Sequence, residues 1–507
     1  MRSGIIVFVL FAFHVSLRAA TIYVPSMSQS NMIWCSTNAH DGDTFIFPAG
    51  TATYTNTSPA GSFVDWCVKW TNAINLQFTP GQSIIQNASG DGYSFVLTFE
   101  TLSGGKPVRI SGLTIDGLQG SSGIVIWGGQ RNVRVTQCVF NNCVHTGLKW
   151  WGQEAYGVTD HCSFTNCEQA IVVYGDDNSS WSTTEGWAHG MGTTNGVYVE
   201  DCNVVYDTNS GWLGTSPLPI ENGHGSRAAY RHNRFLSFSP ANLAFFDSHG
   251  NQLLYPGNHR GSVWTVLENN VFYVLNTYLY CYIRGGGLVM ISNVMSGADA
   301  VAISLTEEEG WRKDLFVPLR VVWPAQDQIT NTWFVNNYVN GKLVDANSIT
   351  NNVRSPIGSV AYGYASSWSD LIFIQEGRDF FVTNDVPPAF GYNHPRIAGG
   401  AYGYTPLTYP HPLVRAIESQ SRPPVVFARA VPNTGSVPLA VSFSATGSYN
   451  RDGTALTYFW TFGDGGFSSE VNPVHTYQSN GTYSAQLFVS DGLTTASTKL
   501  RVKVPGP

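Results

Sequence analysis

The sequence predicts an all-β protein in which a parallel β-solenoid is followed by a small β-sandwich. Three observations predict this fold class. A short phrase built on Cys or Asn recurs at intervals typical of solenoid coils, and residues 425–505 alternate between polar and apolar side chains as sandwich strands do. Charged residues make up only 12% of the 507 residues, about half the usual share, which suits stacked strands joined by Gly and Asn turns.

The N-terminus predicts export. Residues 1–20 contain Arg2, then the mostly apolar run Ile5–Val15, then a small-residue ending at Ala20, which is the pattern of a secretory signal peptide. No later segment reaches 18 uninterrupted apolar residues, so we expect no transmembrane segment and a secreted, extracellular protein. A net charge of −7 makes nucleic acid an unsuitable partner.

The next residues predict the start of the solenoid. Thr21–Val24 has the pattern of a strand, and Ser28–Ala39 that of a short helix closing the open end of a cylinder. The following phrase, Asp41-Gly-Asp43-Thr-Phe-Ile-Phe-Pro48-Ala-Gly50-Thr, resembles the opening of secreted right-handed parallel β-helix proteins of the pectate-lyase-like group. That resemblance implies a right-handed parallel β-helix over residues 21–400. It does not choose a reaction, because the group hosts lyases, hydrolases, esterases and non-catalytic adhesins.

The repeat itself is clearest in two phrases 24 residues apart, Val-Thr-Gln-Cys138-Val-Phe140-Asn-Asn-Cys143 and Val-Thr-Asp-His-Cys162-Ser-Phe164-Thr-Asn-Cys167. In later copies Asn replaces the first cysteine. The ladder position is therefore occupied in turn by Cys138, Cys162, Cys202, Asn233, Asn270, Asn293 and Asn337. The unequal intervals fit a constant coil with loops of varying length, and solenoids usually bind on the side that carries such loops.

Most of the eight cysteines are expected to be buried thiols stacked in this ladder. A bridge between neighbouring rungs is the alternative, because rungs lie roughly 4.8 Å apart. Cys35 and Cys67 lie outside the ladder and form the expected disulfide. No spacing of Cys and His predicts a zinc site, so no metal ligands are assigned.

The repeat ends before a Pro-rich linker at residues 401–424, and residues 425–507 form the second domain. Its phrases Thr457–Gly465 and Asn472–Tyr477 resemble the PKD domain, an immunoglobulin-like module common on secreted bacterial enzymes and surface proteins. Thr461 departs from the Asp usual in that family. The resemblance implies cell-surface or matrix association through this domain. Asn450 and Asp452 would supply a calcium site, although a plain turn is the favoured interpretation, and the sequence demands no other cofactor.

Several solenoid strands end in Gly, and aligning them on that Gly predicts the functional face. Trp151, Tyr174, His249 and Arg284 fall in one column, and Lys149, Val172, Asp247 and Tyr282 fall two residues earlier, on the same face. The phrase Asn222-Gly-His224-Gly225 would add His224 as a further rung. We expect an outward strip of aromatic, acidic and basic side chains along the cylinder.

Two reactions fit such a strip. For β-elimination on a uronate polymer, His249 or His224 would be the base, and a cation would neutralise the substrate carboxylate, namely Arg284, Lys149 or Arg260. For glycoside hydrolysis, Asp247 would pair across the bond with Glu221, or with Asp176 or Asp177, at roughly 5–9 Å. In both reactions aromatic rings such as Trp150, Trp151 and Trp212 would stack on sugar faces, and Tyr174 and Tyr282 would also bind the substrate.

Each of these residues also has a purely structural interpretation. Asp247 would cap a turn, His249 would be a satisfied surface or ladder histidine, and Arg284 would pair with a neighbouring acid. The sequence therefore favours a secreted, carbohydrate-active protein that degrades a polysaccharide by β-elimination or hydrolysis in a groove along the β-helix. The alternative is a non-catalytic adhesin or polysaccharide-binding protein of the cell surface or matrix.

Overall fold

The structure is a computed structural model of the chain, and it describes residues 19–506 apart from several segments. The segments outside the description are residues 63, 101–106, 130, 153–154, 176–190, 207–217, 239–242, 251–260, 275–276, 298–300, 306–328, 346–348, 350–373, 375, 386, 389–402, 415–423, 450–455 and 491–494. The first eighteen residues, which hold most of the predicted signal peptide, also lie outside it. Among the described residues, no helix is long and apolar enough to cross a membrane.

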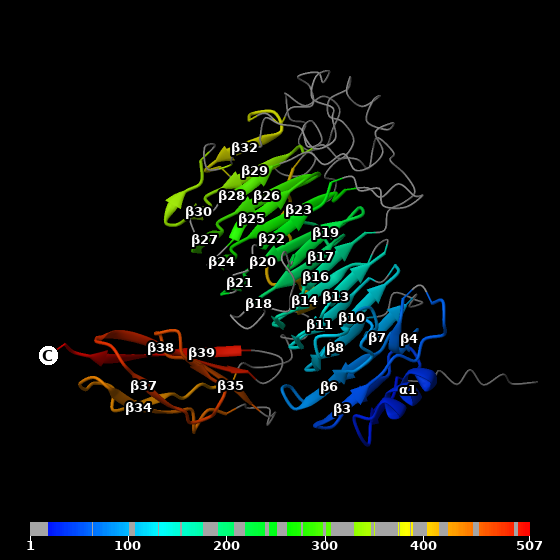
Figure 1. The fold of residues 1–507 in the computed structure, drawn as a ribbon, viewed down its shortest axis with the longest axis horizontal. Coiled ribbons are helices and arrows are strands. Elements are labelled where there is room, and N and C mark those ends of the chain that lie inside the picture. The colour runs from blue at the N-terminus through cyan, green and yellow to red at the C-terminus, as the bar shows by residue number, and fades with distance from the viewer. Residues whose placement is uncertain are drawn as a thin grey trace, which may run out of the picture.

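The described part of residues 19–383 is a right-handed parallel β-helix, as predicted (Figure 1). Three long parallel sheets run along the cylinder, and the chain visits them in turn. Sheet A contains β1 (Thr21–Tyr23), β2 (Thr44–Ile46), β5 (Asn75–Gln77), β8 (Val108–Ser111), β11 (Val133–Thr136), β14 (Gly157–Asp160), β17 (Val197–Glu200), β20 (Arg227–Arg231), β23 (Trp264–Glu268), β26 (Gly287–Ile291), β29 (Thr332–Val335) and β32 (Phe380–Thr383).

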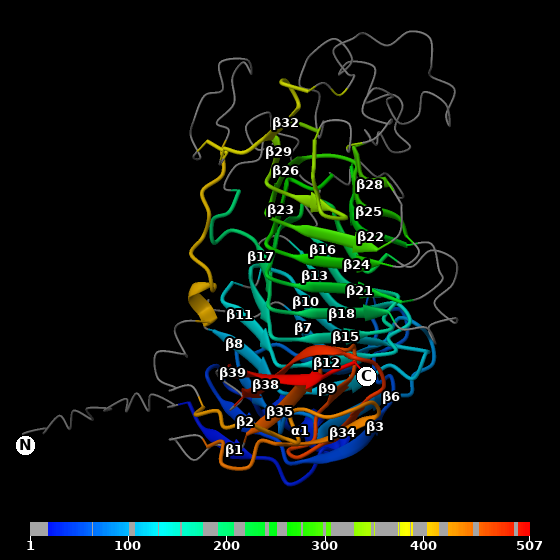
Figure 2. The same ribbon diagram turned by 90° about the vertical axis from the view of Figure 1, so that its left-hand side faces the viewer.

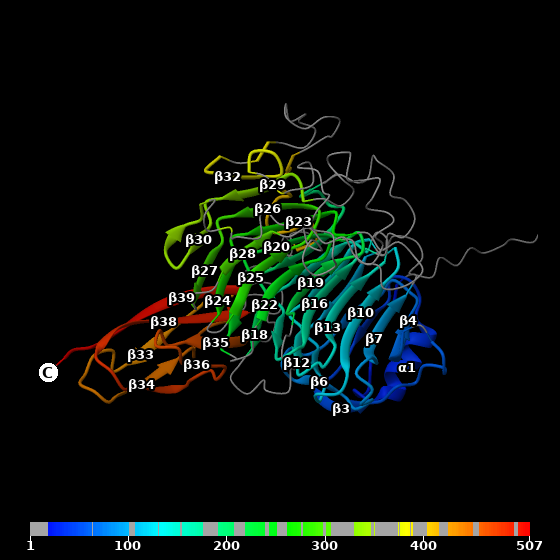
Figure 3. The ribbon, with the colours of Figure 1, turned by 45° about the horizontal axis from the view of Figure 1, so that its top comes forward.

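The other two sheets follow the same order along the cylinder. Sheet B contains β3 (Gly50–Tyr54), β6 (Ser83–Asn87), β9 (Thr114–Asp116), β12 (Val139–Asn141), β15 (Ser163–Thr165), β18 (Asn203–Tyr206), β21 (Arg234–Ser237), β24 (Val271–Val274), β27 (Val294–Gly297), β30 (Tyr338–Val339) and β31 (Lys342–Leu343), of which the last pairs antiparallel. Sheet C contains β4 (Trp66–Trp70), β7 (Phe95–Glu100), β10 (Ser122–Trp127), β13 (Thr146–Trp151), β16 (Gln169–Tyr174), β19 (Ile220–Gly223), β22 (Leu243–Ser248), β25 (Thr277–Ile283) and β28 (Val301–Leu305). Figure 3 shows the strands of sheet C succeeding one another from β4 to β28.

The C-terminal part is an antiparallel sandwich with its own core. Its three-stranded sheet contains β33 (Arg429–Val431), β34 (Leu439–Ser444) and β37 (Val474–Tyr477). Its four-stranded sheet contains β36 (Phe467–Ser468), β35 (Thr457–Thr461), β38 (Gly481–Ser490) and β39 (Thr495–Val504), in that order. Trp460, Tyr477 and Leu487 are fully buried between the sheets, and the Tyr477 hydroxyl donates to the Phe462 carbonyl at 2.9 Å.

A short helix, α1 (Gln29–Asn38), packs against β4 at the N-terminal end of the cylinder, as expected. Ser28 caps it, because its hydroxyl accepts from the Asn31 amide at 3.3 Å and so satisfies one of the unpaired N–H groups of the first turn. The helix buries Met32 and Cys35 against the first coil. It therefore covers apolar side chains that an open end of the solenoid would expose to water.

Inside the cylinder, similar side chains stack from coil to coil. The rings of Phe140 and Phe164 lie 4.7 Å apart with only 4° between their planes, and those of Phe235 and Phe272 also lie 4.7 Å apart. All four are fully buried. The separation matches the spacing of hydrogen-bonded strands, so the ring contacts follow directly from the register of the coils.

The predicted ladder of Cys and Asn side chains is confirmed at the turn from sheet A to sheet B. The Asn233 backbone N–H donates to Asn270 Oδ1 at 3.0 Å, the Asn270 N–H to Asn293 Oδ1 at 3.0 Å, and the Asn293 N–H to Asn337 Oδ1 at 3.0 Å. Each side-chain amide also donates to a backbone carbonyl, as Asn270 Nδ2 does to Tyr230 at 2.8 Å. The ladder thus satisfies backbone groups that would otherwise be buried without partners.

The residue before each ladder position has a left-handed backbone. The φ values of these residues lie between 51° and 58°, and the residues are Gln137, His161, Asp201, His232, Asn269, Ser292 and Asn336. Such a conformation costs little for Asn and Asp but more for other residues. The hydrogen bonds of the next side chain offset that cost at every coil, which explains why the turn is repeated so regularly.

The expected disulfide between Cys35 and Cys67 is wrong. All eight cysteines are among the described residues, and all are free and buried. Cys67 Sγ instead lies 3.5 Å from both Asn87 Oδ1 and Ser89 Oγ, so it takes part in the polar contacts of the next coil. Burial raises the pKa of Cys67 to about 12, which keeps the thiol protonated.

The predicted linker contains a packed segment, the strap, which we define as residues 403–414. It lies against the outer face of sheet A, and Figure 2 shows it running along the cylinder beside β11. Arg231 Nη1 donates to the Leu407 carbonyl at 2.5 Å, and the His411 amide donates to Glu200 Oε2 at 2.9 Å. The Tyr409 hydroxyl donates to Asp201 Oδ1 at 2.7 Å.

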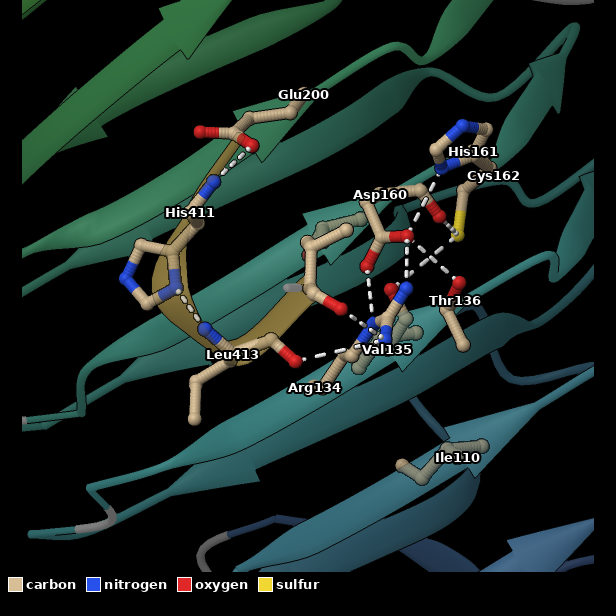
Figure 4. A network of polar contacts seen from close by, with 12 residues as sticks. Ile110, Arg134, Val135, Thr136, Asp160, His161, Cys162, Glu200, His411 and Leu413 are labelled. Carbon is tan, nitrogen blue, oxygen red and sulfur yellow. Dashed lines mark hydrogen bonds and ion pairs between the residues drawn. The ribbon is translucent and has the colours of Figure 1, made fainter. Parts of the chain in front are cut away.

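Buried ion pairs underlie the strap (Figure 4). Arg134 holds Asp160 with two hydrogen bonds of 2.7 and 2.8 Å, and its third nitrogen reaches the Leu413 carbonyl at 3.5 Å. Arg231 is paired with Glu200, where Nε and Nη2 both donate to Oε1. Burying such pairs is costly unless every lone pair and proton is satisfied, and the backbone of the strap supplies those last partners. This network therefore has a structural explanation.

We predict that Asn270→Ala destabilises the β-helix by about 2–3 kcal/mol, because the amide N–H of Asn233 and the carbonyl of Tyr230 lose their partner while buried. Asn270→Cys should cost less, since Cys162 Sγ already accepts from the Cys138 amide at 3.4 Å in the same ladder. Urea unfolding followed by tryptophan fluorescence measures both. Equal losses in the two variants would contradict the proposed role of the side-chain acceptor.

A second prediction concerns pH. Burial, with the nearby charges of Arg231 and Arg134, lowers the pKa of His411 to about 4 against an ordinary value of about 6.5. Between these values the unfolded chain binds the proton and the folded chain does not, so stability falls as pH is lowered through this window. Replacing His411 with Gln should remove that part of the pH dependence between pH 6.5 and 4, measured by urea unfolding. An unchanged slope would contradict it.

Candidate functional site

A cluster of polar side chains lies on the outer face of sheet C, on strands β16, β19, β22 and β25. Ile220, Phe246 and Cys281 point into the core, so the next residue on each strand points outward. The parallel register places Glu221 opposite Asp247, and Asp247 opposite Tyr282. Residues 26 and 35 positions apart along the chain thus become direct neighbours. We call Tyr174, Glu221, Asp247, His249 and Arg284 the polar cluster.

His249 and Arg284 follow in the adjacent column of the same face. Each lies one residue past its strand, yet the inter-coil hydrogen bonds continue: the His249 amide donates to the Asn222 carbonyl and the Arg284 amide to the Ser248 carbonyl, both at 2.8 Å. The backbone therefore holds both side chains as rigidly as a strand would. Tyr174 occupies the same column two coils before His249, because it lies opposite Gly223, which fills the column in the coil between them.

Asp247 and Arg284 form a two-point ion pair. Arg284 Nε donates to Asp247 Oδ1 at 2.9 Å, and Nη2 donates to Oδ2 at 2.5 Å. The aspartate is only 1% exposed. Burial by itself would raise the pKa of Asp247, but His249 and Arg284 outweigh burial and lower it to about 2. Asp247 is therefore a permanent anion at neutral pH.

His249 joins the two carboxylates of the cluster. Its Nε2 lies 3.2 Å from Glu221 Oε1 and 3.2 Å from Asp247 Oδ2. Arg284 Nη2 lies 2.5 Å from Nδ1 of the same ring and 2.7 Å from Nε2. The ring of His249 therefore lies between a guanidinium, which only donates hydrogen bonds, and two carboxylates, which only accept them.

Glu221 is held by two further donors. The Tyr174 hydroxyl donates to Oε1 and the Gln169 amide donates to Oε2. Burial would raise the pKa of Glu221, but the hydrogen bond and charge of His249 and the bond from Tyr174 lower it. Burial and the adjacent carboxylate raise the pKa of Tyr174 well above its usual value, so this phenol keeps its proton.

Aromatic side chains continue the face towards the N-terminus. Lys149 Nζ lies 4.0 Å from the ring centre of Trp151 and 4.7 Å from that of Tyr174, so its charge rests against two aromatic faces. Trp151 stacks in turn on Trp127, with ring centres 5.7 Å apart. Both tryptophans pack on the apolar patch beneath them, which includes Val125.

Most of the predicted strip is therefore brought together. Tyr174, Glu221, Asp247, His249 and Arg284 touch one another, Lys149 and Trp151 adjoin them through Tyr174, and Tyr282 adjoins them through Arg284, whose guanidinium lies 4.9 Å from its ring centre. Arg284 pairs with a neighbouring acid, as its structural interpretation stated. The catalytic and substrate-binding roles assigned to these residues stay predictions. The expected stacking of Trp150 on a sugar is wrong, because this ring is fully buried in the core, and Trp212, Asp176 and Asp177 lie outside the described residues.

Two predicted positions differ. The expected alignment of His224 is wrong by one residue, because β19 ends at Gly223, which lies opposite Tyr174, and His224 then turns away with a φ of 54°. Its ring stacks on that of Tyr174 at 4.1 Å, so it borders the polar cluster without entering the column. Arg260 lies outside the described residues. The sequence could not show where β19 ends, because either Gly223 or Gly225 could be the glycine at the end of this strand.

Gln169 is a member of the site that sequence reasoning missed. It begins β16, and its Oε1 lies 3.2 Å from the hydroxyl of Thr146, which in turn lies 3.0 Å from Nδ1 of His145. The chain of polar contacts therefore runs from Glu221 to the coil before. Gln169 lies an odd number of residues before Tyr174, so period-two alternation gives no signal that would place it on the same face.

The described residues contain no group of three or more His, Cys, Asp or Glu side chains arranged to hold a metal ion. The calcium site considered at Asn450 and Asp452 lies outside the described residues, so it stays a prediction. The polar cluster itself supplies five groups that can take part in chemistry. These are one imidazole, one protonated phenol, a guanidinium and two carboxylates held as anions.

Comparison with known proteins identifies the second domain. Residues 421–504 match the PKD domain family, which confirms the predicted resemblance. Among curated proteins, the chain is 45% identical to collagenase ColQ1 of Bacillus cereus (strain Q1) over 60 residues, which is 12% of this chain and 6% of that protein. The chain thus spans less than a tenth of that relative's length, and the match says nothing about the activity of the whole protein.

Solved structures resemble the two parts separately. A mannuronic acid specific polysaccharide family 6 lyase from human gut microbiota is 14% identical, with 65% of this chain and 84% of that chain covered and a TM-score of 0.35. The PKD1 domain of Vibrio anguillarum Epp is 30% identical, with 17% of this chain and 99% of that chain covered and a TM-score of 0.15. TM-scores this low carry no conclusion about function.

The Asp247–Arg284 pair generates a prediction. Asp247→Asn should destabilise the protein by about 3 kcal/mol at pH 7, because it leaves the Arg284 charge without its anion in a buried site. The folded-state pKa of Asp247 is depressed, so its contribution is present above about pH 4 and is lost as pH falls towards 2. Urea unfolding between pH 7 and 3 should show the difference between wild type and variant shrinking below pH 4. A constant difference would contradict this linkage.

Proposed function

We propose that the chain is an exported, carbohydrate-active protein that cleaves a uronate-containing polysaccharide by β-elimination at the polar cluster. One observation carries this choice: a guanidinium and an imidazole lie in contact within the cluster, at 2.5 Å between Arg284 Nη2 and His249 Nδ1. A cation that neutralises a substrate carboxylate, next to a base that removes the neighbouring proton, is what β-elimination requires.

Hydrolysis fits the cluster less well. It needs one carboxylic acid that keeps its proton at working pH in order to protonate the leaving oxygen. Asp247 is bound by Arg284 at two points with a pKa of about 2, and the pKa of Glu221 is also lowered. Both carboxylates are therefore anions that hold other side chains. Neither has the protonated state that the acid of a glycosidase must have.

The proposed reaction assigns one task to each group. Arg284, with Lys149 beside it, binds the uronate carboxylate and stabilises the negative charge that develops next to it. When Arg284 Nη2 turns from His249 to the substrate carboxylate, Nδ1 of the neutral imidazole takes the C5 proton, the C5–H electron pair forms the C4–C5 double bond, and the C4–O bond breaks. The protonated Tyr174 hydroxyl gives its proton to the leaving oxygen. Charge and protons balance, with one unsaturated uronate and one free hydroxyl as products.

The carboxylates prepare this site. Asp247 fixes the guanidinium by two hydrogen bonds, so substrate meets a cation that is already oriented. Glu221 contacts both Nε2 of His249 and the hydroxyl of Tyr174. One carboxylate therefore positions the proposed base and the proposed acid. Trp127 and Trp151 then offer stacked ring faces to sugars bound further along the polymer.

A second candidate function rests on the burial of the cluster. His249 is 6% exposed and Asp247 is 1% exposed, and each makes several hydrogen bonds inside the protein. A saturated, buried network suits a rigid surface that binds a glycan without cleaving it. The alternative is therefore a non-catalytic adhesin or polysaccharide-binding protein of the cell surface or matrix.

Incubation with polygalacturonate, alginate and a neutral β-glucan separates these functions. We expect the polyuronates to yield unsaturated ends, detected by ultraviolet absorbance, and the glucan to yield none. His249→Ala should lower the rate by about 10²–10⁴-fold, the usual contribution of a general base. His40→Ala is the matched control, because this histidine is distant in the fold and its side chain is 63% exposed.

Three outcomes would count against the proposal. Reducing ends without unsaturation would point to hydrolysis. Silence across the panel, with glycan binding retained, would favour the non-catalytic alternative. Wild-type rates in His249→Ala, with folding intact, would remove the polar cluster from the mechanism.

A further inference from the structure

Three phenylalanine rings lie side by side on the outer face of the four-stranded sheet of the PKD domain, two of them exposed and the third, Phe488, half-buried. Phe467 is 71% exposed and Phe459 is 43% exposed. The ring centres of Phe459 and Phe467 lie 6.0 Å apart, and those of Phe459 and Phe488 lie 6.4 Å apart. The rings come from β36, β35 and β38, so they form one continuous row across three strands.

These rings do not build the core of the domain. Trp460, Leu487 and Val489 are their chain neighbours, and these point inward and are fully buried. Burying a phenylalanine gains roughly 2–3 kcal/mol, so the two exposed rings, Phe459 and Phe467, forgo most of that gain. A contiguous apolar patch of this kind on a domain surface indicates a binding site.

A row of cations adjoins the rings on the neighbouring strand. Lys499, Arg501 and Lys503 are exposed at alternate positions of β39, so their attachment points repeat roughly every 7 Å along the same face. The register places Lys499 opposite Gln486, two residues from Phe488. Within the described part of the domain, no ion pair joins these three cations to a carboxylate. The positive row is notable in a chain whose net charge is −7.

We infer that this face, the PKD aromatic-cationic face, binds an anionic polysaccharide. Phe459, Phe467 and Phe488 offer flat apolar surfaces for the C–H faces of sugar rings, and the cations on β39 meet carboxylate or sulfate groups that repeat along a polymer. A regular row of charges suits a regularly charged chain better than a folded protein. The overall negative charge disfavours nucleic acid. This binding goes beyond the proposed function, since it requires no turnover and uses no residue of the polar cluster.

Affinity electrophoresis of the full chain tests the inference. Gels contain polygalacturonate, alginate, a neutral β-glucan, polyuridylate or gelatin, and every protein carries His249→Ala, so that turnover does not consume the ligand. We expect Phe459→Ala combined with Phe467→Ala to weaken binding to polyuronates roughly tenfold, which corresponds to about 1.4 kcal/mol. Lys499→Ser combined with Arg501→Ser should weaken binding similarly and reduce its salt dependence.

Two matched controls lie on the other sheet of the same domain. Arg429→Ser removes an exposed cation of β33, and Val474→Ala removes an apolar side chain of β37 that is 67% exposed. Both should bind as the parent does. All these side chains are at the surface, so thermal unfolding should be unchanged in every variant.

The inference is overturned if the aromatic and cationic variants both bind as the parent does, or if the parent binds none of the polyuronates. It also fails if the neutral glucan, polyuridylate or gelatin binds as tightly as the polyuronates through the same residues. Turnover at the polar cluster is measured separately in the chain with His249 intact, so loss of binding at the PKD aromatic-cationic face and failure of the proposed function are distinguished.

Discussion

The rest of the structure depends on the hydrogen bonding that holds successive coils in register. At the turn from sheet A to sheet B, the Asn side chains accept from the backbone of the previous coil, as Asn270 does from Asn233 at 3.0 Å, and donate to a carbonyl of another strand. A slip of one residue would break these bonds and reverse the faces of every strand. The ladder therefore sets which side chains point outward. It makes columns from residues that are far apart in the chain.

The register of the coils brings charged side chains together on two of the sheets. On sheet A it stacks Arg134 against Asp160 and Arg231 against Glu200, and the strap completes their hydrogen bonds with backbone groups. On sheet C it stacks Asp247, His249 and Arg284, which complete one another. Buried charges are tolerated in both places because the register of the coils places each one next to an oppositely charged partner. The partner offsets part of the cost of removing the charge from water. The first network fastens the chain to itself, whereas the second assembles groups with complementary acid and base character.

A separate binding face on the PKD domain would complement a site on the β-helix. Two modules joined in one chain bind a polymer with an effective concentration set by the connection between them, so modest affinities combine into firm retention. The aromatic side chains have different charged neighbours in the two domains. Trp127 and Trp151 lie beside titratable groups on the β-helix, while Phe459 and Phe467 lie beside permanent cations. In the two proposals, polysaccharide attachment is assigned to the PKD aromatic-cationic face and cleavage to the polar cluster.

The sequence by itself determined the coil architecture, the ladder, the second domain and the two adjacent columns that contain Asp247 and, beside it, His249 and Arg284, because period-two alternation and repeated phrases are local properties of the chain. It did not reveal that His224 leaves the column, that Gln169 enters the site, that Cys35 and Cys67 stay apart, or that residues 403–414 cover sheet A. Only the tertiary structure decided these, since each depends on where a strand ends or on which segment packs against it. The protonation states of the polar cluster were decided there too, because burial and partners across coils set the pKa values of Asp247 and Glu221.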